Sequence, residues 1–294
     1  MRGILMKNRL AIGTVQFGMP YGIANQGVPV SLDETNAILA HAWSQGIEML
    51  DTAISYGESE KRLGQIGVGS WKNISKLPDV PHSCSNIKDW VNKSVIASLN
   101  DLEVNCLYGI LLHRTHQLLG DQGENIYAAL LELKELGLVE KVGISISEID
   151  ELDAILPNYR FDLIQIPFNI IDRRLTTSGW LPRLKKMGIE IHVRSVFLQG
   201  LLLMDINKHP YYFKRWEKLW QYWKLWLDEQ NITPLQACLN FVLGHLEIDR
   251  IVIGVHNLRQ LQEILDIKPI AINPPKILTS EDLDLINPSR WSLH

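Results

Sequence analysis

The chain has 294 residues, 46% of them apolar, which is enough to build one large hydrophobic core. Lys and Arg number 29 against 33 Asp and Glu, a formal net charge of −4, so binding to nucleic acid through a basic surface is not expected. The three cysteines, Cys84, Cys106 and Cys238, are widely spaced without a Cys-x-x-Cys pair, which argues against a disulfide framework and a cysteine zinc site. These features favour a reducing, cytoplasmic setting.

The sequence contains no pattern typical of an export signal or a membrane span. Its N-terminus, MRGILMKNRLAIG, lacks a long apolar stretch followed by a small-residue cleavage site. No run approaches the roughly 18 uninterrupted apolar residues that a membrane helix needs. We therefore expect neither export nor insertion into a membrane.

Short runs rich in Ile, Val and Leu recur along the chain and predict strands that are covered on both faces, with helix-patterned segments between them. In chain order, strand 9–15 precedes helix 32–45, strand 47–52 precedes helix 58–66, strand 73–77 precedes helix 86–102, and strand 106–113 precedes helix 124–136. Strand 141–146 then precedes helix 148–156, strand 161–168 precedes helix 176–186, strand 189–197 precedes helices 211–229 and 234–245, and strand 250–255 precedes helix 257–265.

This alternation predicts one (β/α)8 TIM barrel, a single α/β domain over residues 1–294. A doubly wound sheet of this length would more often divide into two lobes, and no Ser/Gly/Pro-rich linker marks a division. The interval between strands seven and eight, 197–250, is long enough for an extra helix or a lid over the barrel mouth. The tail, 268–294, is expected to wrap the surface or to contribute to the mouth.

Within the predicted helix 211–229, four Trp residues follow helical spacing and place their rings along one side: Trp216, Trp220, Trp223 and Trp226. Packing of this stripe against the barrel is the interpretation that we favour. The alternative is that part of it lines a substrate pocket or a subunit contact.

Four titratable residues stand at or just after successive strand ends, where a (β/α)8 enzyme carries its working groups. Asp51 ends the second predicted strand with Tyr56 shortly after it, Lys76 ends the third, and His113 ends the fourth. Adjacent strands lie about 4.8 Å apart, so these side chains can converge. Singly, Asp51 could instead cap the next helix and Lys76 could be an ordinary strand-end cation.

Together the four residues make chemical sense for a carbonyl substrate. A Lys cation held by a carboxylate stabilises a phenolate, which makes Tyr56 a credible general acid toward a carbonyl oxygen. His113 can hold that oxygen in line while the carbon receives a hydride from a nicotinamide cofactor. His113 and His116 form an HxxH pair, but no carboxylate or Cys stands nearby at ligand spacing, so no metal is expected.

The segment GIEMLDTAISYGESEKRLGQ, residues 46–65, resembles the signature of the aldo-keto reductase superfamily. Segments 9–18, 98–116, 129–145 and 251–265 are similar to the family's first strand, its Ser-Leu…His stretch, the following helix-strand unit and its cofactor-phosphate segment. The resemblance covers nearly the whole chain. It implies NADP(H)-dependent reduction of an aldehyde or ketone, or the reverse reaction, with Asp51, Tyr56, Lys76 and His113 as the catalytic tetrad.

The resemblance also implies positions that contact the cofactor's nicotinamide end: Thr14 and Gln16 after the first strand, Ser145, and Gln165, which bonds the nicotinamide amide in the family. Ile146 stands where the family has Asn. Arg194 stands where many members place an aromatic ring against the nicotinamide. Its planar guanidinium is expected to stack there, or to turn away and pair with a carboxylate of the mouth or the substrate.

At the phosphate end the resemblance implies Gly254, Val255, Arg259, Gln260 and Glu263, with the amides of the helix start holding the adenosine phosphate. Gly254 stands where some members have Lys, and Gln260 where many have Arg. Gln260 with Glu263 resembles the subgroup that includes the potassium-channel β subunits, which use NADP. We therefore expect NADP rather than NAD, with Arg259 as the candidate cation. In the alternative, Asn257 and Gln260 only cap the helix.

Three functions stay open from the sequence: an NADP(H)-dependent oxidoreductase, which we favour; a regulatory or partner-binding protein that holds the cofactor with little turnover; and a lyase or isomerase that uses Lys76 as a Schiff base. Against the last, a neighbouring Asp51 would keep Lys76 charged. Candidate mouth residues are Phe17, Met19, Tyr21, Arg114 and 198–215. Their polar and basic groups suit a polyhydroxylated or anionic small carbonyl compound such as a sugar. The sequence does not indicate an oligomeric state.

Overall fold

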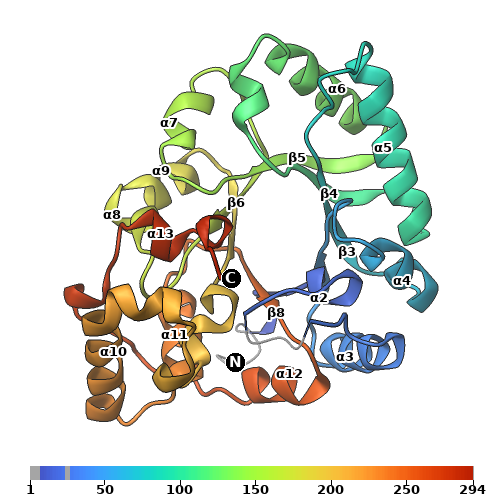
Figure 1. Ribbon diagram of the computed structural model, residues 1–294. Helices are drawn as coiled ribbons and strands as arrows, with labels where there is room; N and C mark the ends of the chain where they lie inside the picture. Colours follow the sequence, from blue (N-terminus) through green and yellow to red (C-terminus); the bar gives the residue numbers. More distant parts are fainter. Residues whose placement is uncertain (1–6, 24–26, 294) are drawn as a thin grey trace.

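The computed structural model describes residues 7–23 and 27–293. Within these residues, eight parallel strands close into a barrel in sequence order, so that β8 pairs with β1 (Figure 1). The strands are β1 (Leu10–Gly13), β2 (Met49–Asp51), β3 (Lys72–Leu77), β4 (Leu107–Leu112), β5 (Val139–Ser145), β6 (Leu163–Pro167), β7 (Glu190–Arg194) and β8 (Arg250–Gly254). The predicted (β/α)8 barrel is therefore confirmed. Residues 1–6, part of the N-terminus that argued against an export signal, lie outside the described residues.

Helices surround the barrel and cover its outer face (Figure 1). Those that the sequence pattern predicted are α3 (Leu32–Ser44), α4 (Ser59–Ile66), α5 (Ile87–Leu102), α6 (Gly123–Glu135), α7 (Glu151–Ile155), α8 (Arg174–Thr177), α9 (Trp180–Lys186), α10 (Glu217–Gln230), α11 (Pro234–Leu243) and α12 (Leu258–Leu265). Two further short helices, α2 (Val15–Gly18) and α13 (Leu283–Ile286), were not predicted, because four residues carry too little periodicity to read.

Most predicted helices differ from the observed ones by at most two residues at an end, and three differ more. The helix expected over 176–186 is split into α8 and α9 at Gly179, whose φ of 78° no right-handed helix contains. The one expected over 148–156 begins at Glu151, because the Glu151 carboxylate accepts the backbone N–H groups of Ser147 and Glu148. The one expected over 211–229 begins as the 3₁₀ turn η4 (Tyr211–Trp216) and continues as α10.

Side chains from alternate strand positions fill the barrel interior. Ala11, Met49, Ile74, Leu111 and Leu163 form an apolar layer inside it, separate from the larger core between strands and helices. A Cβ at Gly143 would lie 2.2 Å from the backbone oxygen of Leu163. Glycine is therefore needed there for β5 and β6 to approach each other. The polar groups lie above and below this apolar layer, at the two ends of the barrel.

The long interval between β7 and β8 holds α10, α11 and the 3₁₀ turns η2 (Leu198–Leu203), η3 (Ile206–Lys208) and η4. Trp220, Trp223 and Trp226 are at most 7% exposed, and the Trp220 indole donates to the backbone oxygen of Phe213 at 2.9 Å. Trp216 is partly exposed and donates to Asp282 at 3.0 Å. The Trp stripe is thus packing, as favoured.

The C-terminal tail wraps past α8 and α10, where Figure 1 shows α13 and the following turn η6 (Pro288–Arg290), after the turn η5 (Lys276–Leu278). Arg173 donates to the backbone oxygens of Pro274 and Pro275 at 3.2 Å, and Ser280 N–H donates to Ile171 O at 3.0 Å. Across the described residues, no helix is both long enough and apolar enough to cross a bilayer.

Candidate active site

The four predicted catalytic residues meet at the C-terminal end of the barrel. Asp51 is the last residue of β2, Lys76 is the penultimate residue of β3, and His113 follows β4 directly. Tyr56 lies in the loop from β2 to α4. A Cβ at Gly18 would come within 1.9 Å of the Tyr56 backbone oxygen, so glycine alone lets α2 pack against this loop.

Lys76 and Asp51 form a buried ion pair. Their Nζ and Oδ2 atoms are 2.7 Å apart, and the side chains are 1% and 6% exposed. Lys76 also donates to Thr52 O at 2.8 Å, and Asp51 Oδ1 accepts from Gln165 Nε2 at 2.6 Å. Burial is the largest single influence and disfavours the ammonium, but the charge and hydrogen bond of Asp51, together with Tyr56, outweigh it and raise the pKa of Lys76. Lys76 is therefore held charged, the opposite of what a Schiff-base lysine requires.

Tyr56 lies close to both the ion pair and the histidine. The Lys76 ammonium is 5.1 Å from the centre of the Tyr56 ring. The His113 ring is 5.8 Å from the same ring, at an interplanar angle of 78°. The Tyr56 phenol thus lies near both a cation and an imidazole.

His113 is neutral at pH 7. Burial, followed by the nearby Lys76 and Arg194 cations, lowers its pKa to about 4. Its Nδ1 lies 3.2 Å from Ser55 Oγ. With Ser55 donating to Nδ1, Nε2 carries the ring proton and can donate to a carbonyl oxygen. The sequence reasoning passed over Ser55, although it directly precedes Tyr56 in the motif.

The residues implied after β1 have distinct environments. Thr14 is buried, donates to Asp51 O at 3.2 Å and accepts from Ser59 Oγ at 2.9 Å, so it ties β1 to β2 and α4. Gln16 is 6% exposed, and its Oε1 has no hydrogen-bond partner among the described residues. A Cβ at Gly254 would lie 2.2 Å from Gln16 Nε2, so the missing side chain at Gly254 makes room for this amide.

Ser145 and Arg194 end β5 and β7, and Gln165 lies in the middle of β6, paired in register with Ser145. Ser145 Oγ is 3.4 Å from Gln165 Oε1. Arg194 Nη2 donates to Ile146 O at 2.9 Å. Arg194 has no ion-pair partner within the described part of the chain. The protein therefore offers it no carboxylate of the mouth to pair with, which was one of the two expected arrangements.

These groups fit a nicotinamide, whose carboxamide needs donors and an acceptor. The Ser145 hydroxyl and the Gln165 amide supply both kinds of group on adjacent strands, beside the tetrad. The unpartnered Gln16 Oε1 is a further buried acceptor.

At the start of α12, protein groups already engage the backbone amides. Gln260 N–H donates to Asn257 Oδ1 at 2.9 Å, and His256 N–H donates to Gln260 Oε1 at 2.8 Å. Leu258 N–H donates to Glu34 Oε1 of α3 at 2.6 Å. Asn257 and Gln260 thus cap the start of α12. Glu34 was missed, because a contact over 224 residues leaves no local signal.

The remaining phosphate-end residues differ in exposure. Arg259 is 85% exposed and pairs with Glu263 at 2.9 Å, one helical turn away. Val255 is fully buried. Neither arrangement brings these side chains together with the tetrad.

The predicted lining of the mouth is only partly correct. Phe17 is fully buried in the hydrophobic core, because the unpredicted helix α2 turns it inward. Met19 and Tyr21 are 37% and 38% exposed. Burial and the neighbouring Tyr56 raise the pKa of Tyr21, which places its phenol beside the tetrad. In the described ranges, no three His, Cys, Asp or Glu side chains cluster in a way that could hold a metal ion.

Residues 9–277 match the model of the aldo/keto reductase family. The chain belongs to this family. Membership makes it an NAD(P)H-dependent oxidoreductase that acts on carbonyl compounds. A comparison with curated proteins gave no match.

Solved structures agree on the fold of this aldo/keto reductase. The holo form of the aldo-keto reductase AKR11C1 from Bacillus halodurans superposes with a TM-score of 0.71 at 20% identity, over 90% of this chain and 88% of that one. The thermostable aldo-keto reductase Tm1743, solved with the inhibitor epalrestat, gives 0.67 at 19% identity, over 90% and 91% of the two chains. At such identities the likeness concerns the barrel alone.

Proposed function

We propose that this aldo/keto reductase reduces an aldehyde or ketone of a polar, sugar-like compound to the alcohol, with Tyr56 as the general acid and NADP(H) as the cofactor. The observation that carries the proposal is the position of the Tyr56 phenol beside both the charged Lys76 and the neutral His113. A bound nicotinamide supplies the hydride.

The protein's part in the reaction is to hold and move one proton. His113 Nε2 donates a hydrogen bond to the carbonyl oxygen and keeps it beside Tyr56. The Tyr56 O–H gives its proton to that oxygen as negative charge develops there. Lys76, kept charged by Asp51, stabilises the phenolate that is left behind. Gln165 donates to Oδ1 of Asp51, the oxygen that does not contact Lys76, and so helps to keep the ion pair in place.

The preference for NADP(H) rests on the family resemblance and on the helix start of α12 with Arg259 beside it. Glu34 opposes this preference, since its carboxylate already occupies the Leu258 amide. A 2′-phosphate at that helix start has to displace Glu34 or lie beside it. We therefore propose a modest preference that Glu34 limits.

A polar substrate is supported by the groups around the mouth. Arg194 is close enough to the tetrad to help lower the pKa of His113, and Tyr21 is close enough to Tyr56 that this neighbour, after burial, raises the pKa of Tyr21. Phenol and guanidinium groups bind hydroxyl and carboxylate groups well. A cytoplasmic location is also our proposal, supported by three cysteines that form no disulfide.

The test combines turnover with cofactor binding. The wild type is assayed with NADPH against a panel of aldehydes, ketones, aldoses and keto acids, and Tyr56→Phe is assayed on the best substrate. We expect Tyr56→Phe to lower kcat by about 100-fold or more, because the phenol proton is used in the transition state, while the Kd for NADPH stays near its wild-type value.

Tyr222→Phe is the matched control, since it makes the same substitution at an exposed position of α10. Full turnover by Tyr56→Phe contradicts the assignment. NADPH binding without turnover on any compound of the panel favours the regulatory protein instead.

A further inference from the structure

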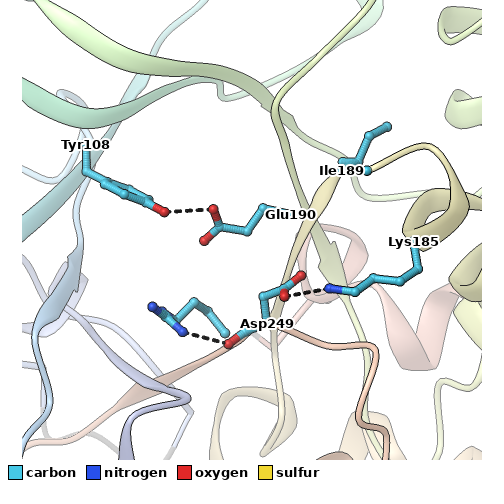
Figure 2. A pocket seen from close by; sticks show the side chains of 7 residues that line it. Tyr108, Lys185, Ile189, Glu190 and Asp249 are labelled. Atoms are coloured by element: carbon cyan, nitrogen blue, oxygen red, sulfur yellow. Dashed lines mark hydrogen bonds and ion pairs between the residues drawn. The ribbon is translucent and has the colours of Figure 1, made fainter.

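A second pocket lies at the opposite end of the barrel from the tetrad. Its volume is about 330 Å³. Figure 2 shows the side chains that line it: Tyr108 at the start of β4, Lys185 and Glu190 on either side of the α9–β7 turn, and Asp249 and Arg250 at the start of β8. The mechanism proposed above uses none of these residues.

The barrel interior ends here in a charged layer. Four charged residues face the same end of the barrel lumen, because each stands two residues before an interior position of its strand. They are Lys72, Lys141, Glu190 and Arg250. The ammonium groups of Lys72 and Lys141 lie 5.7 and 4.5 Å from the centre of the Tyr108 ring. Lys72 also pairs with Glu48 at 3.8 Å. Around the pocket, Lys141, Lys185 and Arg250 therefore face Glu190 and Asp249, an excess of one positive charge.

Both carboxylates of the pocket already accept hydrogen bonds on each oxygen. Glu190 accepts from His192 Nε2 at 2.7 Å, from Tyr108 Oη at 2.8 Å and from Lys141. Asp249 accepts from Lys185 Nζ at 2.6 Å (Figure 2) and from the Ile191 N–H at 2.8 Å. Little acceptor capacity is left for a ligand.

Donor capacity, by contrast, remains. Arg250 Nη1 donates to the backbone oxygen of Asp249 at 3.0 Å, and no other hydrogen bond or ion pair of this guanidinium is found in the described parts of the chain. A guanidinium carries five N–H donors, so most of those of Arg250 are available. Lys185 has donors beyond the one given to Asp249.

We propose that this pocket binds a small anion, the phosphate or carboxylate group of a metabolite, with Arg250 as the bidentate anchor and Lys185 at the rim. The pairing follows from the balance of groups: satisfied carboxylates, a positive charge excess and an unpaired planar guanidinium. Bound there, the anion joins the starts of β7 and β8 to α9 and stabilises the folded state by mass action.

The test measures binding directly and involves no turnover, so its outcome is independent of the proposed reaction. Isothermal titration calorimetry is run on the protein without cofactor, with inorganic phosphate and with malonate, at a constant ionic strength set with chloride. The two ligands distinguish a phosphate from a carboxylate site. We expect saturable binding of at least one, and a Kd at least tenfold higher in Arg250→Gln.

Arg215→Gln is the matched control, because it removes the same charge from an exposed 3₁₀ turn far from the pocket. Lys185→Gln is a second variant within the pocket, expected to raise the Kd about threefold and available if Arg250→Gln does not fold. Circular dichroism in chloride establishes that each variant is folded. Absence of binding in the wild type, or a Kd that neither pocket variant changes, overturns the proposal.

Discussion

Lys76 is charged although its side chain is 1% exposed, and its neighbours explain how. Asp51 supplies the counter-charge, and Thr52 O accepts a second hydrogen bond from the ammonium. Gln165 donates a hydrogen bond to Asp51 and holds it in place. Removing one partner of such a buried pair leaves an uncompensated charge, which typically costs 3–5 kcal/mol. The tetrad is therefore also a structural unit, and its variants need a check of folding before their rates are compared.

The role of Arg194 depends on the ligands that bind beside it. It donates to Ile146 O and has no carboxylate partner in the described ranges. We predict that its guanidinium packs on the nicotinamide, where a fixed positive charge disfavours the cationic, oxidised cofactor. The wild type should then bind NADPH more tightly than NADP⁺. In fluorescence titrations, Arg194→Ala and Arg194→Tyr should both lower the ratio of NADPH affinity to NADP⁺ affinity.

If both Arg194 variants keep the wild-type ratio of the two dissociation constants, stacking is wrong. A rise in KM for the substrate alone would then place Arg194 in substrate binding.

His113 makes stability depend on pH in a definite direction. Its pKa of about 4 in the folded protein lies below the value near 6.5 of an unfolded chain, so between these values the unfolded state binds more protons. Stability is thus unaffected by His113 above pH 6.5 and falls as the pH drops toward 4. At pH 4.5 this histidine should cost about 2–3 kcal/mol.

Urea unfolding at pH 7.5 and pH 4.5 measures the effect, with His113→Gln as the comparison. We expect the loss between the two pH values to be smaller in His113→Gln by about that amount. Equal losses in the two proteins would show that His113 has an ordinary pKa. Ser55→Ala separates this effect from loss of the hydrogen bond to Nδ1.

At the scale of elements, α3 and α12 meet where the resemblance places the adenosine phosphate. Leu258 N–H points at Glu34, and Asn257 and Gln260 close the rest of the helix start. A carboxylate at a helix N-terminus is favourable for the same reason as a phosphate, so the two compete.

We predict that Glu34→Gln raises NADPH affinity by about three- to tenfold and changes NADH affinity little, because only NADPH brings a 2′-phosphate toward that charge. Arg259→Gln should act in the opposite direction. Fluorescence titrations with both cofactors give the ratios. Equal wild-type dissociation constants for NADPH and NADH would contradict the NADP preference. If Glu34→Gln leaves the ratio of these two constants unchanged, Glu34 does not limit the preference.

At the scale of the whole molecule, the C-terminal tail completes the core beside the β7–β8 interval. Leu285 and Ile286 are at most 1% exposed, and the Trp291 ring lies 4.8 Å from the buried Phe213 ring. These contacts join the last part of the chain to η4, more than 70 residues earlier.

We predict that truncation after residue 278 lowers the free energy of unfolding by about 4 kcal/mol or more, because it removes two buried aliphatic side chains and uncovers Phe213. Truncation after Trp291 is the control and should leave the urea midpoint near the wild-type value. An unchanged midpoint in the longer truncation would show that the tail only lies on the surface.

The barrel, and the convergence of Asp51, Tyr56, Lys76 and His113 at one end of it, could be predicted from the sequence alone. Strand runs are local, their period is short, and a closed barrel follows from their count and alternation with helices. Asp51 and Tyr56 lie in one motif, and the strand-end rule brings Lys76 and His113 to them. The exact helix bounds were less predictable, since side-chain caps such as that of Glu151 and the turn at Gly179 override periodicity.

Which charged groups already have partners became apparent only from the three-dimensional structure. The Glu34 contact with Leu258 spans 224 residues, and the free donors of Arg250 are apparent only once Glu190 and Asp249 are seen to be satisfied by other groups. Phe17 likewise turned inward because of a four-residue helix too short to predict. Burial and electrostatic pairing depend on segments distant in sequence, and no local pattern encodes them.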